Sequence, residues 1–188
     1  KPIGNSTNSF RGNFDGRNHT VTGMQISNPS KDYVGLFGEC RKHNINSAIK
    51  NITVKDSTIQ GKSSVGAIVG RAYEINIENC RSIANKIKGE RRVGGICGYF
   101  GGNPGGKVSQ CYNSSQVTGR ESTGGIAGMG DRCTAENCLN TGEIKVTTTQ
   151  NETLSYYEKY ANLNILSVNF NNLKNINTDT VGWLFVPG

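Results

Sequence analysis

The sequence is poor in the residues and runs that mark several large classes of protein. It has four prolines, two histidines, one tryptophan and only 7% aromatic residues. No run approaches the ~18 consecutive apolar residues of a membrane-spanning helix, so we expect no membrane span. Apolar residues other than glycine make up 34% of the chain.

Short catalytic and metal-binding motifs are also missing. The sequence contains no H-E-x-x-H, which argues against a zinc peptidase site in this segment. It contains no C-x-x-C, and His19 and His43 are expected in other coils than the stacked cysteines, so we expect no metal or cofactor. The basic residues, which give a net charge of +7, are spread through the chain and do not alternate with aromatics. We therefore expect no nucleic-acid partner.

Glycine and asparagine are abundant instead, with 25 and 23 residues. Both are poor helix formers, which argues against a helical bundle. Isoleucine and valine recur throughout, which argues against disorder.

The most informative feature is a glycine box that recurs four times, at residues 34–38, 65–70, 93–98 and 123–128. The boxes read VGLFG, VGAIVG, VGGICG and TGGIAG, and their last glycines lie 32, 28 and 30 residues apart. Two further apolar segments stand between consecutive boxes. One reads IKNI, IENC, VSQC and AENC from Ile49, Ile77, Val108 and Ala135, and the other begins at Ile59, Ile87, Val117 and Ile144.

A period near 30 residues with three short β-branched segments, each bounded by Gly or Asn, predicts strands and turns. No helical spacing interrupts residues 9–146. One repeat cannot bury its own apolar face, but stacked repeats can. We therefore predict an all-β, parallel β-solenoid of about five coils over residues 1–146, right-handed by default, with three sheets and strands about 4.8 Å apart.

Residues 147–188 depart from the repeat and are predicted to form a C-terminal cap. The cap would hold a helix over residues 152–167 and a strand near residues 183–186. The alternative is a linker toward a further domain. The chain opens on Lys1-Pro2 without an apolar leader, which we interpret as a removed signal peptide or an excised segment of a longer protein.

The V-G-G-I-x-G and I-x-N-C boxes, together with the opening F-x-G-x-F-D-G at residues 10–16 and H-T-V-T-G at 19–23, resemble the GLUG-motif repeat family of bacterial surface proteins. The resemblance covers residues 9–146 and departs from the pattern at Ala67-Ile68. It implies an extracellular or cell-surface, adhesin-like protein whose motif is structural and carries no catalytic residues. Similar repeats also form non-catalytic parts of larger surface proteins, including immunoglobulin A-cleaving metallopeptidases.

Two repeat positions are predicted to be structural. One holds Cys80, Cys111 and Cys138, with Ile52 in the earlier coil, and is predicted to be a column of buried free thiols. A disulfide between adjacent coils, or between Cys133 and Cys138, is the alternative. The other position is predicted to be a ladder of side-chain amides bonded from coil to coil, at Asn51, Asn79, Gln110 and Asn137.

Two groups of turn residues are candidates for ligand binding. The turn before each box is basic and would stack into a positive stripe, which is either a solvated corner or a docking stripe for an anionic glycan or polymer: Lys31, Lys62, Arg91, Arg92 and Arg120. The segment after the box offers aromatics that either stack on sugar rings or fold back over the coil edge: Arg71, Tyr73, Tyr99 and Phe100.

We therefore predict a non-enzymatic, secreted or cell-surface module, adhesin-like or a spacer, that is monomeric and presents turn residues to a host or microbial surface glycan or protein. One alternative is a carbohydrate-active β-solenoid enzyme, a lyase or hydrolase. Its carboxylates would be Glu78 and Glu136, which share a repeat position two coils apart, about 9.6 Å. The other alternative is a non-catalytic stalk of a larger surface protein.

Overall fold

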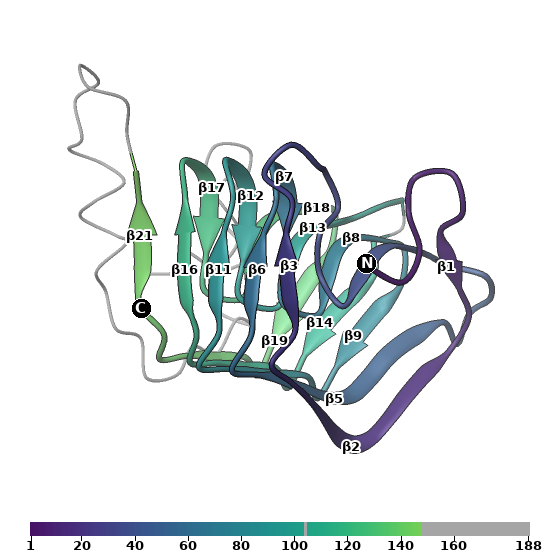
Figure 1. Cartoon of the computed structure of the whole chain (residues 1–188). Helices are drawn as coiled ribbons and strands as arrows, with labels where there is room; N and C mark the ends of the chain where they lie inside the picture. Colours follow the sequence, from purple (N-terminus) through teal and green to yellow (C-terminus); the bar gives the residue numbers. More distant parts are fainter. Residues whose placement is uncertain (104, 148–188) are drawn as a thin grey trace.

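A computed structural model describes residues 1–103 and 105–147 of the chain. The regular elements of these residues are 21 strands, without a helix. The strands stack in parallel from coil to coil (Figure 1), which confirms the predicted all-β solenoid of about five coils. The predicted cap over residues 147–188, with its helix and strand, lies outside the described residues except for Thr147.

The described strands form four parallel sheets, where the sequence predicted three. Sheet A contains β1 (Phe10–Arg11), β4 (Phe37–Arg41), β8 (Val69–Tyr73), β13 (Cys97–Gly101) and β18 (Ala127–Asp131). Sheet C contains β3 (Gln25–Ser27), β6 (Thr58–Gln60), β11 (Lys86–Lys88), β16 (Gln116–Gly119) and β21 (Ile144–Val146). The additional sheet, sheet D, contains β7 (Ser63–Val65), β12 (Arg91–Gly94) and β17 (Glu121–Gly124).

Sheet B is the widest sheet, because two long strands of the first coils are each continued by two short strands in the later ones. The long strands are β2 (Phe14–Thr22) and β5 (Ala48–Lys55). The short ones are β9 (Asn76–Glu78), β14 (Lys107–Ser109) and β19 (Thr134–Glu136) on one side, and β10 (Arg81–Ile83), β15 (Tyr112–Asn113) and β20 (Leu139–Asn140) on the other.

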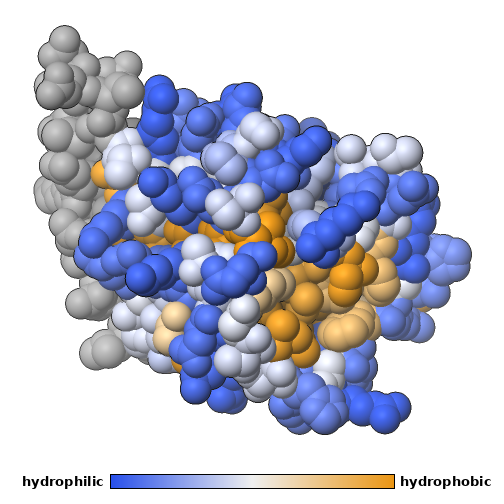
Figure 2. All heavy atoms as spheres, viewed as in Figure 1, coloured by the Kyte–Doolittle hydropathy of each residue, from blue (hydrophilic) through white to orange (hydrophobic). Residues whose placement is uncertain are grey.

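The core lies between the sheets, and the sizes of its side chains change from coil to coil. Sheet A aligns Phe37 with Val69, Cys97 and Ala127 in successive coils, so the side chain at this position shrinks toward the last coil. At the N-terminal end the rings of Phe10 and Phe14 pack on Phe37, with centroids 5.1 and 5.0 Å away. Figure 2, viewed as Figure 1, shows a mostly hydrophilic surface with an apolar band across its middle.

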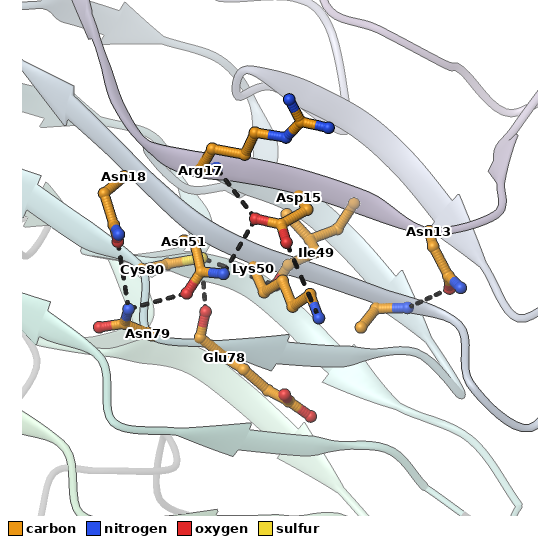
Figure 3. Close-up of polar contacts among 11 residues, drawn as sticks. Asn13, Asp15, Arg17, Asn18, Ile49, Lys50, Asn51, Glu78, Asn79 and Cys80 are labelled. Atoms are coloured by element: carbon orange, nitrogen blue, oxygen red, sulfur yellow. Dashed lines mark hydrogen bonds and ion pairs between the residues drawn. The ribbon is translucent and has the colours of Figure 1, made fainter.

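Asparagine marks the corner within sheet B. Asn51, Asn79, Gln110 and Asn137 all have φ between 47° and 55°, a left-handed conformation that Asn tolerates better than most residues. Asn79 Nδ2 donates to Asn51 Oδ1 at 2.8 Å, and Asn51 Nδ2 donates to Asp15 Oδ1 at 2.9 Å (Figure 3). The predicted amide bond from coil to coil is confirmed between Asn51 and Asn79.

All six cysteines are free and buried, so neither alternative disulfide is formed. The Sγ atoms of Cys80, Cys111 and Cys138 lie 3.6–3.8 Å from carbonyl oxygens of the coil before. Each thiol therefore acts as a small apolar side chain with a weak donor, as the prediction of a buried column requires.

Each glycine box forms the corner between sheet D and sheet A. In the third box, Val93 and Gly94 end β12, and Cys97 and Gly98 begin β13. A Cβ atom on Gly98 would lie 2.3 Å from Ser64 C and Val65 N. Sheet D therefore packs directly on the backbone of sheet A, which brings residues of sheet D beside the exposed face of sheet A.

Candidate functional site

The exposed face of sheet A carries the residues that the sequence singled out after each box. The strand register aligns Glu39, Arg71, Tyr99 and Met129 in one row, and Arg41, Tyr73, Gly101 and Asp131 in a second. Between the two rows lie residues whose side chains point into the core, such as Phe100. The two rows therefore form one surface that extends over four coils, from β4 to β18.

Arg71 stands at the centre of this surface. Its guanidinium carbon lies 5.3 Å from the ring centroid of Tyr33, 5.8 Å from that of Tyr73 and 5.6 Å from that of Tyr99. Its Nη1 donates to Tyr33 Oη at 3.1 Å. Three aromatic rings and one hydroxyl therefore hold this guanidinium in place.

The series of arginines and tyrosines continues on both sides of Arg71. Arg41 lies over the Tyr73 ring at 5.2 Å, and Arg92 lies over the Tyr99 ring at 5.3 Å. Arg92 reaches sheet A from β12, where its backbone has φ 55°. We name this surface the Arg–Tyr face and define it by Tyr33, Arg41, Arg71, Tyr73, Arg92 and Tyr99.

Two carboxylates border the Arg–Tyr face. The Glu39 side chain is 1% exposed and contacts Arg41 Nε at 2.5 Å and Arg71 Nη1 at 3.8 Å. Tyr99 Oη donates to Asp131 Oδ2 at 3.3 Å. Burial, followed by the Asp131 charge, raises the pKa of Tyr99 above its ordinary value, so the phenol keeps its proton at neutral pH. Three guanidinium groups against two carboxylates leave the face positive.

Four of the predicted binding residues meet on this face: Arg71, Tyr73, Arg92 and Tyr99. The expectation that Phe100 is an exposed aromatic is wrong. Phe100 lies in β13 and is 1% exposed, because strand alternation turns it into the core while Tyr99 faces out. Tyr33, Arg41 and Glu39 belong to the site but were missed. Counting one and three residues past the last glycine of each box would have found Glu39 and Arg41.

The predicted basic stripe is interrupted. Backbone hydrogen bonds run from Lys62 N to Lys31 O, from Glu90 N to Lys62 O and from Arg120 N to Glu90 O. Glu90 therefore occupies the place in the row where an arginine was expected. Arg91 pairs in register with Glu121, so acidic residues interrupt the basic stripe at two places. The Arg92 side chain belongs to the Arg–Tyr face and not to the stripe.

The two carboxylates considered for hydrolysis are aligned, and one of them forms an ion pair with a lysine. Glu78 and Glu136 pair with Ser109 from either side in sheet B. Lys107 Nζ lies 2.8 Å from Glu136 Oε1, and this bond raises the pKa of Lys107. Glu136 is therefore engaged in a surface ion pair. In residues 1–103 and 105–147 no three His, Cys, Asp or Glu side chains are grouped to hold a metal ion.

Comparison with known proteins gives partial relatives. No family model matches the chain. Halomucin of Haloquadratum walsbyi is 31% identical over 101 residues, which are 52% of this chain and 1% of that protein. The "Putative Gly-rich membrane protein" of Evansella cellulosilytica is 31% identical over 78 residues, 40% of this chain and 9% of that protein. The chain thus spans less than a tenth of either relative.

One solved structure resembles the fold. It is titled as a putative immunoglobulin A1 protease from Bacteroides ovatus, and it aligns with a TM-score of 0.50 and 18% identity over 74% of this chain and 53% of that chain. At this identity the likeness concerns the fold. Within the described part of the chain, no helix is long and apolar enough to cross a membrane.

Proposed function

We propose that this chain is a non-enzymatic β-solenoid module of a microbial cell-surface protein, and that its Arg–Tyr face binds an anionic glycan. The observation that carries the proposal is the alternation of Arg41, Tyr73, Arg71, Tyr99 and Arg92 on one exposed face. Membership of the GLUG-motif family remains part of this proposal.

The chemistry of the face suits a ligand with carboxylate or sulfate groups on sugar rings. A guanidinium group offers a planar fork of N–H donors that matches such an anion. Here the tyrosine rings already fix the guanidinium of Arg71, so less side-chain freedom is lost on binding. The half-buried rings of Tyr73 and Tyr99 each lie between two guanidinium groups and so space the donors along the face.

The surface location is supported by the names of relatives, one of which is that of a membrane protein. The non-enzymatic part is supported by the Lys107–Glu136 ion pair, which engages one of the two aligned glutamates. A spacer role is the second candidate. The unbroken ladders that join successive coils favour it, because they suit a stiff rod.

The test is binding of the purified chain to an array of matched acidic and neutral glycans at low and physiological salt. We expect acidic glycans to bind, with affinity that falls as salt screens the arginines. The double variant Tyr73→Ala with Tyr99→Ala should lose at least about tenfold in affinity.

Tyr112→Ala is the matched control, because Tyr112 is a half-buried tyrosine of sheet B whose hydroxyl bonds to Thr141, away from sheet A. It should bind like the parent chain. Equal binding by the double variant, or a preference for neutral glycans, would contradict the proposal. An array without any hit would favour the spacer role.

A further inference from the structure

The N-terminal end of sheet C carries an open strand edge. β3 is the last strand of the sheet, next to β6. Thr58 N donates to Met24 O, and Asn28 N donates to Gln60 O, so the even-numbered residues of this segment direct their main-chain groups toward β6. The main-chain groups of Gln25 and Ser27 therefore face the opposite side, where no described strand pairs with them.

A pocket of about 800 Å³ lies along this edge. Residues 25–28 and 31–34 form one wall, and residues 1, 2 and 4–8 form the other. Ile26 and Val34, both buried, supply apolar side chains to the wall. Their positions matter because Ile26 begins the inward row of sheet C, and Val34 bridges to Val65 of sheet D.

We propose that this pocket receives an extended peptide strand, which pairs in parallel with β3 as β3 itself pairs with β6. Such a strand would extend the parallel pairing that already joins the strands of sheet C. Each of the other strands of sheet C places one apolar residue in register with Ile26, beginning with Ile59 in β6 and Ile87 in β11. A peptide with an isoleucine or valine at that place would continue the apolar row and satisfy the open main-chain groups.

The shape of the pocket favours a strand over a compact ligand. Its lining follows the chain from sheet C into sheet D, so an extended segment could pair with β3 and then pass beside Val34. Residues 58–65 of the chain, TIQGKSSV, make this same passage one coil later. The site is separate from the Arg–Tyr face apart from Tyr33, which lines the pocket and contacts Arg71.

The test uses synthetic peptide TIQGKSSV, labelled with a fluorophore and titrated with the purified full chain. In the native ladder Lys86 N donates to Ser57 O, and Gly61 N donates to Lys88 O. The main-chain groups of odd-numbered residues in this segment, which include Ile59, therefore face the following coil. When the peptide lies in the pocket, the following coil is the one that contains β3. The peptide's isoleucine N–H would then face β3, and its glutamine N–H would face away. N-methylation of the isoleucine should weaken binding at least about tenfold, whereas N-methylation of the glutamine should leave it unchanged.

A chain variant gives a second measurement. Ser27→Pro removes an N–H on the open edge and keeps the main-chain bonds to β6, although it also removes the long side-chain bond from Ser27 Oγ to Gln60 Oε1 at 3.5 Å. The preceding residue is already extended. We expect a similar melting temperature and at least tenfold weaker peptide binding. Equal binding of both methylated peptides, or no saturable binding of the parent peptide, would overturn the proposal. Retained acidic-glycan binding by Ser27→Pro would separate this site from the Arg–Tyr face.

Discussion

Arg71 shows how one residue organises a surface. It contacts rings contributed by Tyr33, Tyr73 and Tyr99, which come from three different coils. Glu39 lies beneath it, and the Glu39 side chain is almost completely buried. The arginine is therefore fixed from its sides and below, while its 26% exposed side chain still presents donors to solvent.

Glu39 is the residue on which this arrangement depends most. Glu39→Ala removes the only acidic partner of Arg41 and Arg71 among the described residues. Because both arginines are partly exposed and can regain water, we expect a loss of about 2 kcal/mol in unfolding free energy, less than for a fully buried pair. Urea unfolding measures it.

The control for Glu39 is Glu90→Ala, an exposed glutamate, which should change the unfolding free energy by less than about 0.5 kcal/mol. Similar losses for the two variants would show that burial of Glu39 does not set its contribution.

At the residue scale, the sequence predicted which residue types the strands carry better than it predicted which way each side chain points. It identified Tyr99 and Phe100 as a pair, but alternation in β13 exposes the first and buries the second. It missed Tyr33, because nothing in a single repeat indicates that a residue with φ 60°, just before the Val34 bridge to sheet D, would lie over sheet A. Long-range packing of that kind depends on how the coils close, which local patterns do not encode.

At the scale of elements, the sequence predicted each glycine box as one strand segment, whereas the third box is the corner between two short strands, β12 and β13. The three-segment repeat predicted three sheets, and the fourth arises because Val65 and Val93 pair in their own short strands. The corner between sheets D and A then closes over the last glycine of each box. Close backbone approach, rather than an unusual φ, explains glycine there.

Gly98→Ala tests this corner. Its Cβ would meet backbone atoms of Ser64 and Val65 at 2.3 Å, and backbone cannot move without displacing sheet D. We expect a loss of about 3 kcal/mol or more in thermal or urea unfolding.

Gly61→Ala is the matched comparison, because its nearest contacts are side-chain atoms, the methyl groups of Val34 and Val65 at 2.7 and 2.8 Å and Val34 Cβ at 2.9 Å, rather than backbone. It should cost clearly less than Gly98→Ala. The reverse order would mean that sheet D does not pack rigidly on sheet A.

At the scale of the whole molecule, the solenoid holds its coils together with a narrow core that contains six thiols. Burial raises the pKa of Cys40, Cys97, Cys111 and Cys133, to about 12 for Cys133. Cys138 differs, because a hydrogen bond from Cys111 lowers its pKa. The core therefore favours the protonated thiol at four of the six positions.

This arrangement predicts loss of stability at alkaline pH. An unfolded thiol titrates near pH 8.5, so above that pH the unfolded chain releases protons that the native core retains. The contribution of each raised thiol is complete below about pH 8.5 and declines by up to about 1.4 kcal/mol per pH unit until the native pKa is reached. Urea unfolding in reductant at pH 7.5, 9 and 10.5 should show this decline.

The control variant is Cys97→Val, whose register neighbour is Val69. It removes one titrating group, so its unfolding free energy should decline less steeply with pH. Parallel curves for the two proteins would assign the alkaline loss to groups other than this buried thiol.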